Sequence, residues 1–176
     1  RDYHFNKVKT FHHMMDERTQ EEPRAWDLEG ATHRAGFKIE ELVEFVRAAS
    51  PSEEDFGQAV SQLHQALDKA ADKVVKKTPA QQDLIGQVDA LIDTLYFTYG
   101  SFVLMGVDPE RIFDIVHQAN MGKIFPDGKA HFDPVTHKIL KPDDWEEKYA
   151  PEPAIKKELQ RQLKAYERHK ERNNTQ

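Results

Sequence analysis

The 176-residue sequence contains no cysteine. This absence excludes disulfide bonds, thiolate catalysis and cysteine-ligated zinc, and it fits a cytoplasmic protein. No apolar run approaches the roughly 20 residues of a membrane-spanning helix, so no membrane partner is expected. A glycine-rich GxxxxGK(S/T) loop is also missing, which excludes the mechanism of P-loop nucleotide enzymes. With 38% hydrophobic and 32% charged residues, the sequence predicts a soluble globular protein.

Charge is distributed unevenly along the chain. The formal net charge is -6, but residues 156–172 contain seven Lys or Arg and three Glu, a local charge of +4. The rest of the chain therefore carries about -10, which is -6 minus +4. An acidic body disfavours binding to nucleic-acid polymers, because their phosphates require a basic surface. It suits a protein that binds cations.

Apolar residues recur at spacings of three and four along most of the chain, which predicts an all-α fold, an antiparallel helical bundle. The segment near residues 121–142 lacks this period and is rich in glycine and proline, so it is expected to be irregular, with a small hairpin of residues 129–132 and 138–140. Helices are expected at about residues 5–15, 32–49, 52–78, 80–105, from 109 onward, and 153–172.

Two parts of this fold have separate expectations. Residues 1–150 are predicted to form the all-α domain, and the basic amphipathic helix within residues 151–176 is predicted to belong to the same domain or to an oligomer interface. The helix over residues 80–105 is the most apolar and is therefore expected to be the central one.

Acidic residues form pairs on two of the expected helices. Glu41 and Glu44, preceded by Glu40, lie on one helix, and Asp89 and Asp93 lie on another. Spacings of three and four place both members of a pair on one helical face, close enough for one cation to bridge them. Their neighbours on these faces are apolar, so covering the carboxylates would be costly without a positive partner.

Two interpretations of the first acidic cluster are possible. A hard divalent cation such as Mg²⁺, which prefers oxygen ligands, would satisfy carboxylates on both helices. Alternatively, the glutamates lie on a solvated face and form ion pairs with nearby bases of the same helix, namely Arg34, Lys38 or Arg47.

The irregular segment carries four lysines and an asparagine, which are Asn120, Lys123, Lys129, Lys138 and Lys141. Lysine ammonium groups are compact, mobile charges suited to phosphate, and an asparagine amide can bind a base or a sugar. The segment is therefore a candidate substrate-binding loop. The alternative is a loop whose lysines are only solvated.

These residues resemble a known family, the all-α nucleoside triphosphate pyrophosphohydrolases, which include MazG-like proteins, dimeric dUTPases and phosphoribosyl-ATP pyrophosphatases. The resemblance lies in residues 34–44, 89–100, 120–129 and 138–142. It implies Mg²⁺, or Mn²⁺, as cofactor and hydrolysis of the α,β-phosphoanhydride of an NTP or dNTP to a monophosphate and pyrophosphate. It also implies a homodimer or a dimer of dimers, because the family commonly builds its site from two subunits.

Carried over by position, the resemblance makes Glu41 and Glu44 the ExxE pair and Asp89 the aspartate of a second motif, ExxD. These three are expected to be both catalytic residues and metal ligands, with Glu40 as a general-base or outer-shell residue. The glutamate of the second motif is replaced here by Gly86. Asp93, one turn beyond Asp89, is the expected replacement ligand. The alternative is a non-catalytic helical dimer that binds a nucleotide or a protein.

Overall fold

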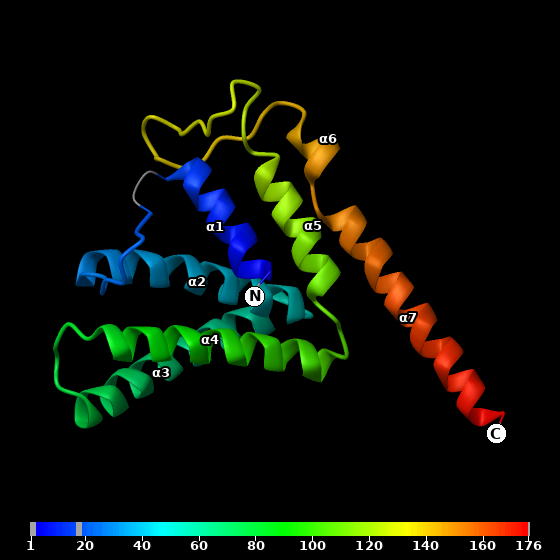
Figure 1. Ribbon diagram of the computed structural model, residues 1–176. Helices are drawn as coiled ribbons and strands as arrows, with labels where there is room; N and C mark the ends of the chain where they lie inside the picture. Colours follow the sequence, from blue (N-terminus) through cyan, green and yellow to red (C-terminus); the bar gives the residue numbers. More distant parts are fainter. Residues whose placement is uncertain (1–2, 17–18, 176) are drawn as a thin grey trace. The chain divides into compact units, whose positions relative to one another are not determined.

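The computed structural model describes residues 3–16 and 19–175. Within these ranges the chain forms seven helices, and its β-structure is limited to one isolated bridge (Figure 1). The predicted all-α fold is confirmed. The helices are α1 (Tyr3–Met15), α2 (Leu28–Ala49), α3 (Glu53–Lys77), α4 (Leu84–Met105), α5 (Glu110–Met121), α6 (Trp145–Tyr149) and α7 (Glu152–Asn174).

The chain divides into two compact units. The carboxylate unit, Glu22–Asp93, contains α2, α3 and the first part of α4, and within it α2 contacts α3. The lysine unit, Arg1–Glu21 with Thr94–Gln176, contains α1, the rest of α4 and α5 to α7. Within the lysine unit α5 contacts both α1 and α7.

Helix boundaries in the carboxylate unit follow local capping contacts. The Asp27 side chain accepts a hydrogen bond from the Gly30 N–H at 2.7 Å, so α2 begins four residues earlier than predicted. The sequence analysis expected this helix to begin at about residue 32 and missed the cap. The α3 helix begins close to the predicted residue 52, because the Ser52 side chain accepts from the Asp55 N–H at 3.1 Å.

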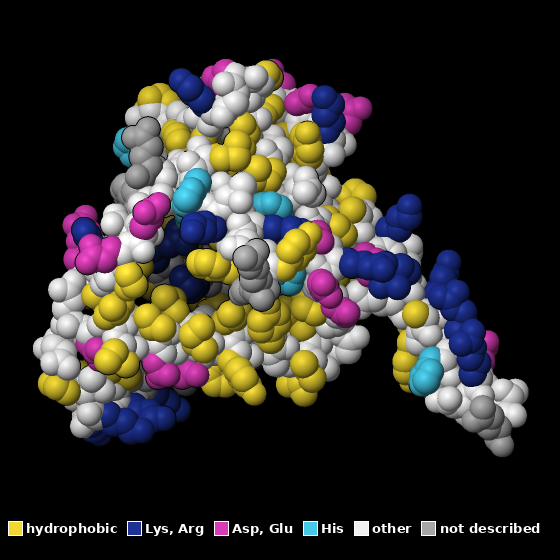
Figure 2. Space-filling view, viewed as in Figure 1, with side chains coloured by type: hydrophobic (Ala, Val, Ile, Leu, Met, Phe, Trp, Pro, Cys, Tyr) yellow, Lys and Arg dark blue, Asp and Glu magenta, His cyan; other side chains and the backbone are white. Residues whose placement is uncertain are grey.

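The most apolar helix, α4, begins beside Asp83, whose side chain accepts from the Ile85 N–H at 3.0 Å. It ends at Gly106, whose φ of +70° is a left-handed conformation that favours glycine. The sequence analysis expected α4 to be the central helix, but in the single chain no α4 residue is buried. Ile85 is 81% exposed and Leu104 90% exposed, and apolar side chains gather over this helix in Figure 2.

The irregular segment contains a smaller hairpin than expected. Phe132 and Ile139 form an isolated antiparallel bridge, flanked by hydrogen bonds from the Leu140 N–H to the His131 carbonyl at 2.7 Å and from the Asp133 N–H to the Lys138 carbonyl at 2.8 Å. The prediction placed the pairing correctly but anticipated longer extended pieces. The short helix α6, which follows the hairpin, was not predicted.

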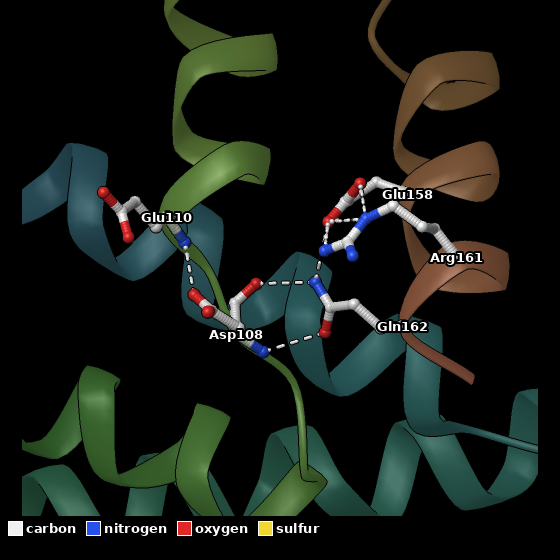
Figure 3. A network of polar contacts seen from close by, with 5 residues as sticks. All are labelled: Asp108, Glu110, Glu158, Arg161 and Gln162. Carbon is white, nitrogen blue, oxygen red and sulfur yellow. Dashed lines mark hydrogen bonds and ion pairs between the residues drawn. The ribbon is translucent and has the colours of Figure 1, made fainter. Parts of the chain in front are cut away.

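A polar network joins α7 to the turn between α4 and α5 (Figure 3). Glu158 of α7 is buried, and its carboxylate accepts hydrogen bonds from Arg161 at 2.7 to 3.1 Å and from Gln162 at 3.3 Å. Chiefly the Arg161 hydrogen bonds lower the pKa of Glu158 to about 2. Gln162 also forms hydrogen bonds with the backbone of Asp108, so this face of α7 is held against the turn before α5.

Among the described residues, no helix combines the length and the hydrophobicity that a membrane span requires.

Candidate active site

The three glutamates of the first acidic cluster, Glu40, Glu41 and Glu44, lie on α2 and are exposed. Within the described part of the chain, none of them forms an ion pair. Exposed glutamates without a basic partner remain available as oxygen ligands.

The bases that the solvated-face interpretation would use have other contacts. Arg47 forms an ion pair with Glu53 of α3, with a 3.0 Å hydrogen bond from Nη1 to Oε2. Lys38 donates to the Arg34 carbonyl at 3.3 Å, and burial lowers the pKa of Lys38. The Arg34 guanidinium lies 5.5 Å from the centroid of the Phe37 ring. This set of contacts leaves the glutamates of α2 free of the neutralisation that the alternative requires.

The second acidic pair, Asp89 and Asp93, lies on α4 and is also exposed. Exposed apolar residues surround it on the same helix, including Val88, Leu91 and Ile92. Both acidic pairs therefore lie on apolar helical faces, as predicted, but the faces are uncovered in the single chain.

The single chain does not gather the two acidic pairs into one cluster. Among the described residues no group of three or more His, Cys, Asp or Glu side chains is arranged to hold a metal ion. The side-chain amides of Gln82 and Gln87 donate to the Trp26 carbonyl at 3.0 Å, and the Trp26 N–H donates to Gln87 Oε1 at 2.8 Å. These bonds join the residues before α2 to the beginning of α4.

The two pairs also lie at different distances from the beginnings of their helices. In Figure 1, α2 and α4 run in the same direction from their joined beginnings. At about 1.5 Å per residue, Glu41 lies roughly 20 Å along α2 from Leu28, whereas Asp89 lies only about 8 Å along α4 from Leu84. Measured along the helices from these beginnings, Glu41 and Asp89 therefore differ by about 12 Å.

Two of the predicted lysines converge on one aromatic ring. The Lys141 Nζ lies 4.1 Å from the centroid of the Trp145 ring, and the Lys123 Nζ lies 5.9 Å from it. Trp145, on α6, is only 6% exposed, and its Nε1 donates to the Ala119 carbonyl at 2.8 Å. Asn120 is the next residue of α5 and is half-buried.

Lys129 and Lys138 are exposed and lie in the turns of the irregular segment. The Lys129 N–H donates to Asp127 at 2.9 Å. The Asp127 carboxylate also contacts His131 Nε2 at 2.7 Å, and this hydrogen bond is the main cause of its lowered pKa. The His131 ring stacks on Phe125 with 3.9 Å between centroids. This turn is therefore held by its own contacts.

Helix α6 contributes two aromatic residues that the sequence interpretation missed. Besides Trp145, Tyr149 lies against the backbone of Gly122, where any Cβ would stand 2.4 Å from the Tyr149 ring. The two aromatic residues are four positions apart, so they lie on one helical face. That spacing, within an otherwise charged stretch, was the available signal.

Comparison with protein families matches residues 8–120 to the phosphoribosyl-ATP pyrophosphohydrolase family. The chain belongs to this family. No curated protein matches it. Among solved structures, the crystal structure of a candidate NTP pyrophosphohydrolase from Exiguobacterium sp. 255-15 is similar, with 39% sequence identity and a TM-score of 0.85. The alignment covers 93% of this chain and 98% of that chain.

The family assignment establishes the general chemistry. The chain is a hydrolase that acts on phosphoanhydride bonds and has the all-helical MazG-like fold that the sequence resemblance implied. Pyrophosphohydrolases of this kind generally use divalent metal ions. The match over residues 8–120 includes both acidic pairs and Asn120, and it ends before the lysines and α6.

Proposed function

We propose that this enzyme hydrolyses a nucleoside or deoxynucleoside triphosphate to the monophosphate and pyrophosphate with Mg²⁺ as cofactor. The oxygen of a water molecule forms a bond to the α-phosphorus, and the bond from that phosphorus to the α,β-bridging oxygen breaks. Pyrophosphate leaves with the bridging oxygen, and the water proton passes to a base. The similarity to a candidate NTP pyrophosphohydrolase supports this substrate class.

The observation that carries the proposal is the state of the two acidic pairs. Glu41, Glu44, Asp89 and Asp93 lie on apolar faces of helices within the family match, and all four are exposed. Among described residues none of the four has an ion-pair partner. Unpaired carboxylates on a surface that is otherwise suited to burial require a cation once that surface is covered.

The donor set fits the metal. Four carboxylates offer the hard oxygen ligands that Mg²⁺ prefers, and Mn²⁺ would accept the same set. When bound, such an ion lowers the pKa of water and offsets the charge of the phosphates. Glu40, beside the ligand pair, is the candidate base that accepts the water proton.

The lysines have a separate role in this proposal. Lys123, Lys129, Lys138 and Lys141 bind the phosphates and stabilise the negative charge that grows on the leaving pyrophosphate. Asn120 binds the sugar or the base through its side-chain amide.

A second copy of the chain completes the acidic site in this proposal. One chain leaves the two pairs without a common cluster and leaves the apolar residues of α4 uncovered. Contiguous exposed apolar surface of this kind marks a protein interface. A homodimer, or a dimer of dimers, would cover it. The basic helix α7 is proposed to belong either to the lysine unit alone or also to that interface.

A nucleotide mixture tests the activity. Pyrophosphate should appear when the protein is incubated with mixed nucleotides and Mg²⁺, and Glu44→Gln or Asp89→Asn should abolish most of it. Calorimetry should show that each variant also weakens Mn²⁺ binding by about tenfold or more, since each removes a ligand. The exposed Glu54 of α3 supplies the control, Glu54→Gln, with unchanged binding. If both ligand variants keep full activity and unchanged Mn²⁺ affinity, the acidic site is refuted.

The second candidate is a non-catalytic regulatory dimer, which Gly86 favours because it removes an expected acidic ligand. This candidate predicts nucleotide binding without pyrophosphate release. The same incubation, followed by equilibrium dialysis with the nucleotides, separates the two functions.

A further inference from the structure

Two half-buried basic side chains of α2, Arg34 and Lys38, lack an acidic partner. Within the part of the chain that the structure describes, neither forms an ion pair with a carboxylate. The half-buried Lys7 of α1, by contrast, pairs with Asp114 of α5. Covering a positive charge is costly unless a negative charge compensates it. The surface around Arg34 and Lys38 therefore favours a bound anion.

The two charges also act on each other. Arg34 and Lys38 are four residues apart, so they are neighbours on one face of α2. Lys38 Nζ donates to the Arg34 carbonyl at 3.3 Å, and thus reaches back along the helix and not forward to Glu41. Burial lowers the pKa of Lys38, and the positive charge of Arg34 lowers it further. An anion beside both side chains would reverse this unfavourable effect.

A ring holds the Arg34 guanidinium. The guanidinium carbon lies 5.5 Å from the centroid of the Phe37 ring. The His33 ring contacts Phe37 in a T-shaped arrangement, with 4.7 Å between the ring centroids. A guanidinium beside an aromatic ring keeps its N–H donors, and their planar fork matches two oxygens of one phosphate group. Arg34 is therefore the more specific of the two phosphate-binding groups.

The two bases share their helical face with proposed metal ligands. Arg34 precedes Glu41 by seven residues, close to two full turns, and Lys38 precedes it by three. At 1.5 Å per residue, Arg34 lies about 10 Å before Glu41 along α2, and Lys38 about 4.5 Å before it. One helix thus presents two uncompensated cations next to the carboxylates of a metal site.

We propose that Arg34 and Lys38 form an anion site on α2, which binds the pyrophosphate part of the triphosphate beside the metal ligands Glu41 and Glu44. This site rests on the proposed function for the identity of its substrate. It gives the carboxylate unit phosphate-binding groups of its own, in addition to the four lysines of the lysine unit. The two bases stabilise the negative charge that grows on the leaving pyrophosphate.

Binding of inorganic pyrophosphate tests the site without catalysis. Pyrophosphate is titrated into the full chain by calorimetry in metal-free buffer. Arg34→Gln and Lys38→Met should each weaken binding by about tenfold, because each removes a charged hydrogen-bond donor to the anion. Lys69→Met is the control, since it removes the same charge at an exposed position of α3. It should change the affinity by less than about twofold.

Unfolding measurements separate binding from a purely structural role. The lowered pKa of Lys38 means that the folded protein disfavours its positive charge. Lys38→Met should therefore leave the urea midpoint unchanged or raise it. Pyrophosphate should raise the midpoint of the original protein, but hardly that of Lys38→Met. A structural lysine predicts the opposite result, which is a lower midpoint with the pyrophosphate effect retained.

Metal binding provides the complementary readout. Arg34→Gln removes no oxygen ligand, so its Mn²⁺ affinity in the absence of pyrophosphate should stay within about twofold of the original value. Glu44→Gln should show the reverse pattern, with weak Mn²⁺ binding and undiminished pyrophosphate binding in metal-free buffer. The anion site is overturned if Arg34→Gln and Lys38→Met lose no more pyrophosphate affinity than Lys69→Met.

These outcomes are distinct from failure of the proposed function. Pyrophosphate binding that depends on Arg34 and Lys38, without any nucleotide hydrolysis, would refute the activity and keep the anion site. Nucleotide hydrolysis with pyrophosphate binding that is insensitive to both residues would keep the activity and refute the anion site.

Discussion

Gln162 and Asp108 form a reciprocal pair between a side-chain amide and a backbone. Gln162 Nε2 donates to the Asp108 carbonyl at 2.9 Å, and Gln162 Oε1 accepts from the Asp108 N–H at 3.0 Å (Figure 3). The Asp108 side chain in turn accepts from the Glu110 N–H at 2.9 Å and so begins α5. One α7 residue thereby holds the turn that joins α4 to α5.

Replacing Gln162 should loosen α7. Gln162→Ala removes the two hydrogen bonds to the Asp108 backbone and the longer one to Glu158, at a partly exposed position, and should lower the free energy of unfolding by about 1–2 kcal/mol. Urea titration measures this change. Gln160→Ala, two residues earlier on an exposed face of α7, serves as the control and should change stability by less than about 0.5 kcal/mol. Equal losses in both variants would show that the Gln162 pair contributes nothing specific.

The buried Glu158 predicts an acid-dependent contribution to stability. Its pKa falls from the ordinary 4.5 to about 2, first because of hydrogen bonds from Arg161 and further because of Gln162. Because the pKa of Glu158 is lower in the folded state, its ionised carboxylate stabilises the folded protein. This stabilisation is fully present above about pH 4.5 and is lost as the pH falls toward 2. The stability advantage of the original protein over Glu158→Gln should therefore be constant from pH 7 to 5 and shrink by pH 3.

Urea midpoints at pH 7, 5 and 3 measure this advantage. Glu167→Gln, at an exposed position of the same helix, should show no comparable pH dependence. A Glu158→Gln difference that persists unchanged at pH 3 would contradict the lowered pKa.

Asp93 tests how the chain tolerates Gly86. If Asp93 replaces the missing ligand, Asp93→Asn should reduce kcat/KM on the order of 100-fold, comparable to Asp89→Asn, as expected for a group that organises metal-ion catalysis. Asp72→Asn, at an exposed position of α3, should leave the rate unchanged. A loss of less than a few-fold in Asp93→Asn would assign Asp93 to a non-ligand role, and Gly86→Glu should then raise metal affinity.

The surroundings of Gly86 make a separate prediction. A Cβ at this position would stand 2.7 Å from Asp83 Oδ2, and the other oxygen of that carboxylate accepts the Ile85 N–H at the beginning of α4. Gly86→Ala should therefore raise the helix propensity of α4 but weaken the contact between Asp83 and the Ile85 N–H. The two effects oppose each other, so the free energy of unfolding should change little. With Asp83→Ala already present, Gly86→Ala should stabilise by about 1 kcal/mol. A urea double-mutant cycle measures the coupling, and additive effects would exclude it.

Much of the local structure was predictable because it depends on neighbours in sequence. The apolar spacing identifies the helices, Ser52 and Asp55 mark the beginning of α3, and Gly106 marks the end of α4. The beginning of α2 was missed because Asp27, whose side chain accepts from the Gly30 N–H, lies before the residue where the helix was expected to begin.

The candidate site was predictable only in part. The sequence identified which carboxylates share a face, because the helical period alone decides that. It did not show that Trp145 gathers Lys123 and Lys141, since those contacts join three segments that are distant in sequence.

The sequence by itself determined the helices, their caps and the chemical nature of the acidic and basic residues, all of which depend on interactions within a few residues. Only the tertiary structure decided that α4 is exposed along its length, that the two acidic pairs stay apart, and that α6 covers the end of α5. The physical reason is that burial depends on which surface covers a helix. In the single chain no such surface buries any residue of α4.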